Sequence, residues 1–140
     1  NNDFCTYLAA AKKLRYLDLS GASSETSGIT DAGITSLTAN NPLLEVLLLR
    51  DVYKGSSDAL MQLKNLTHLI ELDLSKITTA GVIVSGDVIS MLGTMPNLRF
   101  LRLTNNIASN DPRIFSTFEN SKIEQLWMDR VFSLKRIYTY

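Results

Sequence analysis

The chain has 140 residues, of which 45% are hydrophobic and 20% are charged, a composition that excludes a disordered chain and suits one domain with an apolar core. Fourteen Lys and Arg residues balance fourteen Asp and Glu residues, and without surplus positive charge we expect no nucleic-acid partner and no membrane partner. The only cysteine, Cys5, cannot form an internal disulfide, and no stretch reads as a signal peptide or a membrane span. We therefore expect an intracellular protein of the cytoplasm, the nucleus or an organelle matrix.

Five heptads of the form L-x-x-L-x-L-x predict five β-strands. They lie near 14–20, 44–50, 69–75, 98–104 and 123–129, so that their first positions are 30, 25, 29 and 25 residues apart. In such a strand the leucines point to one side and the residues between them to the other. The repeat spans nearly the whole chain and predicts a single domain over residues 1–140.

Apolar residues between the heptads change to helical spacing, which predicts a helix before each strand. The stripes are formed by Phe4, Tyr7, Leu8 and Ala11; Ile34 and Leu37; Leu60, Leu63 and Leu66; Val88, Ile89, Leu92 and Met95; and Ile114, Phe115 and Phe118. We expect all of them to point inward. Residues suited to helix starts lie at Asp3, Thr30, Ser57, Gly86-Asp87 and Asp111-Pro112.

Two stretches of small and polar residues lengthen the first and third repeats. They cover 21–28 and 78–86, where each strand turns toward the next helix. For the apolar run 82–84 two interpretations stay open, a segment tucked under the rim and an exposed docking tab. At the C-terminus, 131–140 predicts either a cap over the last strand or the start of a sixth repeat.

With its heptads placed, the chain resembles the leucine-rich repeat superfamily. The stretch 28–37 running into 41–49 is similar to the cysteine-containing repeats of F-box substrate adaptors and to the ribonuclease-inhibitor class. The resemblance implies an α/β fold, a right-handed solenoid of about five strand–helix repeats with a parallel, concave sheet. The chain departs from the cysteine-containing pattern at Asn41 and Met95, and only Asn106 could join the family's asparagine ladder.

Residues able to carry catalysis are sparse. The one histidine, His68, is expected to be a solvated turn residue, and no nucleotide-binding or zinc-binding pattern occurs. Asp18 and Asp73 fall on the first and third strands, roughly 10 Å apart by strand spacing, and are expected in water. We expect no enzyme, no cofactor, no metal and no small-molecule substrate.

The outward positions of the strands are the candidate binding face. Large apolar residues there are not explained by the core, because the concave face of a repeat sheet carries no helix. The candidate partner-binding residues are Tyr16, Val46, Leu48, Arg50, Phe100, Arg102 and Trp127. Tryptophan, tyrosine and arginine dominate the energetics of protein interfaces.

These observations predict a non-enzymatic protein-binding module that engages another protein or protein complex on the strand face. An adaptor that presents a partner is one form of this function. A structural subunit permanently docked in a larger assembly is the alternative, and an enzyme is the least favoured class.

Overall fold

The computed structural model describes residues 2–21, 28–77, 84–104 and 113–128. Five strands form one all-parallel sheet in the order β1-β2-β3-β4-β5. They are β1 (Tyr16–Asp18), β2 (Val46–Leu48), β3 (Glu71–Asp73), β4 (Phe100–Arg102) and β5 (Gln125–Trp127). The helices are α1 (Asn2–Ala10), α2 (Asp31–Asn40), α3 (Ser57–Leu60), α4 (Gly86–Gly93) and α5 (Arg113–Glu119), and the 3-10 helix η1 (Met61–Asn65) continues α3. The α/β class and the parallel sheet implied by the resemblance are confirmed.

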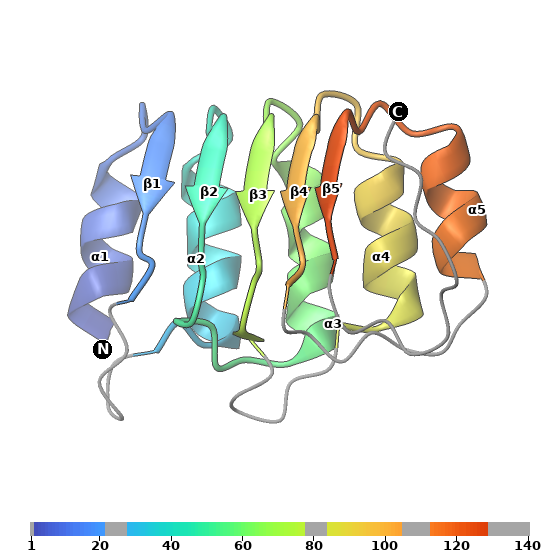
Figure 1. The fold of residues 1–140 in the computed structure, drawn as a ribbon. Helices are drawn as coiled ribbons and strands as arrows, with labels where there is room; N and C mark the ends of the chain where they lie inside the picture. The colour runs from blue at the N-terminus through green and yellow to red at the C-terminus, as the bar shows by residue number, and fades with distance from the viewer. Residues whose placement is uncertain (1, 22–27, 78–83, 105–112, 129–140) are drawn as a thin grey trace.

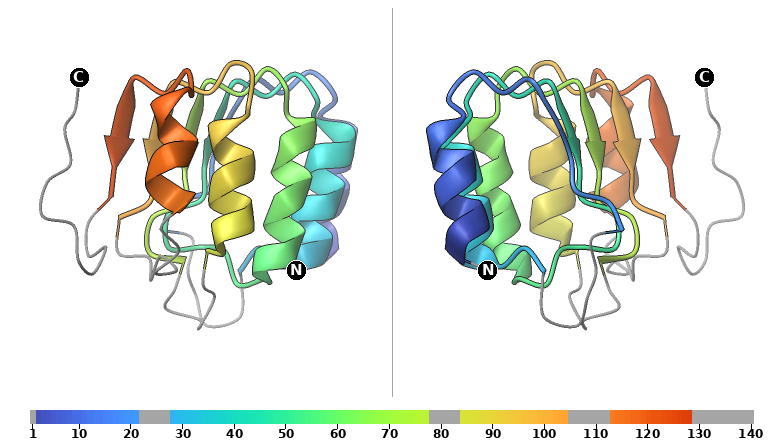
Figure 2. Two further views of the ribbon diagram at one scale, coloured as in Figure 1. Left: turned by 90° about the vertical axis from the view of Figure 1, so that its right-hand side faces the viewer. Right: turned by 90° about the vertical axis from the view of Figure 1, so that its left-hand side faces the viewer.

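The helices lie on one side of the sheet. Figure 1 shows the five strands side by side in front of the helices, and the two turned views of Figure 2 show the helices as a separate layer behind the strands. In the part of the chain that the structure describes, no helix covers the opposite face. We call that opposite side the open face. No described helix is both long enough and apolar enough to cross a membrane.

The strand register places equivalent heptad positions in rows across the sheet. The middle row, which points toward the helices, consists of Leu17, Leu47, Leu72, Leu101 and Leu126. Its three interior members are completely buried, with 0% of their surface exposed. The inward orientation of the heptad leucines is therefore confirmed for the interior strands, while the two end leucines are only partly buried because each has a neighbouring strand on one side.

The described residues of the helix stripes supply the other half of the core, except Tyr7 and Ala11 of the first stripe, which are exposed. Ile34 and Leu37 of α2 and Leu92 of α4 are fully buried. Tyr7 of α1, expected to point inward, is instead 74% exposed. In the same helix Leu8 is buried, and α1 is the first helix of the layer, so it packs against a neighbouring helix on one side only.

Serine side chains cap the first turn of two helices, and each cap lies one residue before the start that the sequence predicted. Ser56 caps α3 by accepting a hydrogen bond from the Ala59 amide at 3.2 Å, and Ser85 caps α4 by accepting from the Val88 amide at 3.3 Å. Thr30 does occupy the cap position of α2 but makes no side-chain cap bond. The expected start at 111–112 lies outside the described residues.

Asn41 explains one departure from the cysteine-containing repeat pattern. It is fully buried, and its side-chain Nδ2 donates to the carbonyl of Leu8 at 3.1 Å and to that of Leu37 at 3.2 Å. Both carbonyls lie near the C-terminal ends of their helices, where each also accepts one backbone amide, from Ala11 and from Asn41. The side-chain amide of Asn41 thus joins α1 to α2 through two donated hydrogen bonds. A cysteine could not do this, because a thiol has only one hydrogen to donate.

A residue in the left-handed conformation lies three positions after each of the first three strands. Gly21, Asp51 and Lys76 have φ angles of 73°, 60° and 59° and occupy the same position, seven residues after the first Leu of their heptads. The amide of each donates to the next repeat, to the carbonyls of Arg50, Ser75 and Thr104 at distances of 2.9–3.2 Å. A left-handed turn therefore continues the hydrogen-bonded ladder past the strand and sends the chain toward the helix layer.

This turn can be tested at Gly21, where an added Cβ would meet no atom within 4 Å. Because only the backbone conformation is penalised, Gly21→Ala is expected to lower the free energy of unfolding by about 1–2 kcal/mol. Lys76→Gly at the equivalent position is expected to do the opposite and raise it by up to about 1 kcal/mol. Chemical denaturation followed by circular dichroism measures both, and equal effects of the two substitutions would contradict the assignment.

Candidate partner-binding face

The open face is formed by two rows of side chains. The first row is Tyr16, Val46, Glu71, Phe100 and Gln125, and the second is Asp18, Leu48, Asp73, Arg102 and Trp127. Six of the seven candidate binding residues belong to these rows, and the seventh, Arg50, follows β2 by two residues and is exposed. The position two residues beyond each strand, where Arg50 lies, is not uniformly outward, since Ser20 is exposed and Ser75 is buried.

The apolar candidates form two groups. Tyr16, Val46 and Leu48 lie on the neighbouring strands β1 and β2, whereas Phe100 and Trp127 lie on β4 and β5. The side chains of β3 between the two groups are acidic, Glu71 and Asp73. Tyr16 is 59% exposed and Trp127 is 37% exposed, so aromatic surface reaches solvent in both groups.

Arg102 connects the acidic strand to the second apolar group. Its guanidinium carbon lies 4.4 Å from the centroid of the Trp127 ring, a cation–π contact between directly paired residues of β4 and β5. The same guanidinium forms an ion pair with Glu71. Both charged side chains are about one-third exposed, and a single chain of contacts therefore runs Glu71–Arg102–Trp127 across three strands.

Asp18 and Asp73 make equivalent hydrogen bonds to the backbone but differ in their exposure to solvent. In each, a carboxylate oxygen accepts the amide of the serine two residues later, Ser20 or Ser75, at 2.8 Å. The expectation that both lie in water is wrong for Asp73, which is buried. Asp18 is on the edge strand with one neighbour, whereas Asp73 is flanked by Leu48 and Arg102, and these larger side chains enclose it.

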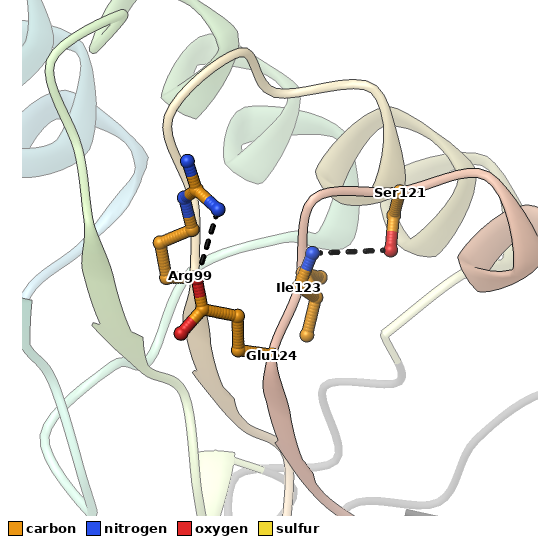
Figure 3. Close-up of polar contacts among 4 residues, drawn as sticks. All are labelled: Arg99, Ser121, Ile123 and Glu124. Carbon is orange, nitrogen blue, oxygen red and sulfur yellow. Dashed lines mark hydrogen bonds and ion pairs between the residues drawn. The ribbon is translucent and has the colours of Figure 1, made fainter. Parts of the chain in front are cut away.

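Ion pairs also join the points at which strands begin. Arg99 and Glu124 precede β4 and β5, and their side chains meet at 2.9 Å (Figure 3). Arg15 and Glu45 make the equivalent pair before β1 and β2. These pairs are largely exposed and each contributes well under about 1 kcal/mol to stability. In each pair the positive and negative charges cancel beside the open face, so these residues add no net charge to it.

Two further features bear on chemistry. His68 is exposed, as expected for a turn residue. Over the described residues no group of three or more His, Cys, Asp or Glu side chains could hold a metal ion. Of the two lengthened stretches, 22–27 and 78–83 lie outside the described residues, as do the C-terminal segment 129–140 and Asn106, while Val84 is buried.

A cluster that the sequence did not reveal lies away from the open face. The Asp31 carboxylate accepts from the Ser56 amide at 2.6 Å, from the Ser56 hydroxyl at 2.9 Å and from the Tyr53 hydroxyl at 3.2 Å. The bonds from Ser56, the backbone one foremost, lower the pKa of Asp31. Burial, followed by the charge of Asp31, raises the pKa of Tyr53. The cluster joins the start of α2 to the segment that leads into α3.

Comparison with known proteins shows the fold. No family model matches the chain, and no curated protein matches it. Among solved structures, it is similar to "Leiomodin-1 Actin-Binding Site 2 (ABS2)", with a TM-score of 0.66 and 12% sequence identity over 91% of this chain and 78% of that one. An α/β chain with this layered arrangement therefore has a structural counterpart of very different sequence.

The lowered pKa of Asp31 predicts a pH-dependent contribution to stability. Because the folded-state pKa lies below the unfolded value, the contribution is present above about pH 4 and is lost as the pH falls through the folded-state pKa. Asp31→Asn is expected to cost about 0.5–1 kcal/mol at pH 7, since the carboxylate is exposed and screened, and almost nothing near pH 2. Denaturation midpoints measured from pH 2 to pH 7 test this.

Asp58 provides the matched control, because it also lies in the first turn of a helix and is exposed. Asp58→Asn removes a comparable carboxylate outside the cluster, and we expect stability to depend on pH differently in Asp31→Asn than in this variant. A pH dependence of Asp31→Asn identical to that of the parent would show that the cluster does not hold the carboxylate.

Proposed function

We propose that this chain is a leucine-rich repeat module, a right-handed solenoid whose open face binds a partner protein. It has no catalytic role and needs no cofactor, and it works inside the cell. The observation that carries the proposal is aromatic surface on a sheet face without a described helix, at Tyr16 and Trp127. Exposed aromatic residues grouped with an arginine match the composition of interface hot spots.

The heptad pattern and the one-sided helix layer support the solenoid assignment. Repeats of a strand followed by a helix stack so that each contacts its neighbours, and the described helices and strands follow that order with sequential pairing throughout. The structural neighbour is named as an actin-binding site, which makes actin one defined protein to test. The identity of 12% does not transfer that partner.

The adaptor form of the function is favoured over a permanently docked subunit. Val46, Leu48 and Phe100 are only partly exposed, and the acidic residues of β3 interrupt the apolar surface. Permanent interfaces are larger and more continuous in their apolar surface than this face is. The adaptor form predicts that the isolated chain is soluble and monomeric and that it binds its partner reversibly.

Affinity capture with matched variants tests the binding face. Tagged parent protein is compared with Trp127→Ala and Tyr16→Ala, and captured proteins are quantified by mass spectrometry. We expect a specific partner whose recovery falls at least tenfold with either variant, because loss of a hot-spot aromatic costs about 2 kcal/mol or more of affinity. Purified actin is measured in parallel by co-sedimentation.

Lys64→Ala is the control, since Lys64 is exposed on η1 in the helix layer. It is expected to retain the same partners as the parent. Equal recovery by all folded variants would place the binding surface elsewhere, with the stretches 21–28 and 78–86 as the next candidates. If Trp127→Ala unfolds the chain, Tyr16→Ala on the opposite edge strand decides the question.

A further inference from the structure

Trp127 is held within a chain of contacts that reaches two strands away. Its ring carries the Arg102 guanidinium, and that guanidinium is paired with Glu71. Glu71 lies opposite Phe100 in the strand register, so its contact with Arg102 runs diagonally to the position two residues further along β4. Diagonal neighbours of this kind lie within reach of long side chains.

Asp18 and Arg50 have the same two-residue offset between neighbouring strands, although Arg50 lies beyond the end of β2, and in the described part of the chain their side chains are not paired. Asp18 lies opposite Leu48, and Arg50 is two residues beyond Leu48, yet within the described structure Arg50 forms no ion pair. Aspartate is one methylene shorter than glutamate, and the Asp18 carboxylate is turned to the Ser20 amide. Without Glu71 the Arg102 guanidinium would lose its ion pair and keep only the contact with the Trp127 ring.

The ion pair has two consequences for Trp127. An arginine side chain loses rotamer freedom when it is fixed, and a partner that meets an already fixed group avoids that cost on binding. In addition, Glu71 neutralises the guanidinium, so the surface beside the indole offers no net positive charge to an acidic group. Asp73, paired with Arg102 in the strand register, adds negative charge beside the same guanidinium.

We propose that Glu71 is a positioning and specificity-determining residue of the binding face: by holding and neutralising Arg102 over Trp127, it makes this end of the face an anchor site for an apolar or aromatic side chain of a partner protein and rejects acidic ones. The proposal rests on the proposed function for the partner's existence. The arrangement of Glu71, Arg102 and Trp127 is testable without any partner.

The single tryptophan of the chain makes its fluorescence a direct probe of this arrangement. Iodide is an anionic quencher and acrylamide a neutral one, so the ratio of their quenching constants reports the charge beside Trp127. Glu71→Gln keeps the side-chain shape and removes the charge that neutralises Arg102, and we expect the iodide-to-acrylamide ratio to rise about twofold or more at low salt. An unchanged ratio in the folded variant would overturn the proposal.

Glu45→Gln is the matched control, because Glu45 also pairs with an arginine of a neighbouring strand but lies at β2. It is expected to leave the ratio unchanged, and an equal rise would overturn the assignment to Glu71. Arg102→Lys gives an independent variant if Glu71→Gln does not fold. Lysine keeps the charge without the planar stack, so we expect greater acrylamide quenching of Trp127, and quenching equal to the parent's would count against the proposal.

Selection from a random peptide library displayed on phage tests the specificity. Peptides that bind the parent and lose binding with Trp127→Ala are expected to carry apolar or aromatic anchors and few acids. Selection on Glu71→Gln is expected to enrich Asp or Glu at least threefold beside the anchor. The same peptide composition from both proteins would overturn the specificity claim, whereas a failure of Trp127→Ala to affect any peptide would contradict the proposed function instead.

Discussion

The in-register pairing of five parallel strands is the constraint on which the rest of this structure depends. Once Leu17, Leu47, Leu72, Leu101 and Leu126 are aligned in one row, the helices must lie on that side to bury them. A shift by one residue in any strand would expose its leucine and bury its polar neighbours. The cost of such a shift fixes both the core and the identity of the residues on the open face.

The same register explains why the open face carries an organised contact rather than scattered side chains. Parallel pairing places Arg102 beside Trp127 and within diagonal reach of Glu71, so three strands contribute one residue each to a single chain of contacts. Where the acid is shorter, at Asp18, the corresponding arginine stays without an ion partner among the described residues.

The sequence predicted what depends on periodicity. Leucine spacing was enough for the strands and for the side to which their leucines point, and the resemblance that it carries was enough for the parallel sheet. Alternation was enough to place Arg102 and Trp127 on the same face. It did not predict contacts that join residues far apart in the chain without a repeating pattern. The cluster of Asp31 with Tyr53 and Ser56 is of this kind, and so is the bond from Asn41 to the Leu8 carbonyl.

Two errors have a common physical origin. Tyr7 was expected to be buried and is exposed, while Asp73 was expected in water and is buried. Both depend on position along the row of repeats: Tyr7 belongs to the first helix, which has one neighbour, and Asp73 to the central strand, which has two. The left-handed conformations of Asp51 and Lys76 were missed because neither residue type signals a positive φ as glycine does.

Fluorine NMR of the protein labelled with fluorotryptophan tests the central claim, that partner binding takes place on the open face. Trp127 is the only tryptophan, so the spectrum contains one protein resonance even when an unlabelled partner is added. Partner binding on the open face is expected to shift or broaden this resonance in proportion to complex formation and to shield it from a soluble paramagnetic quencher. Formation of a stable complex with an unchanged Trp127 resonance would contradict it.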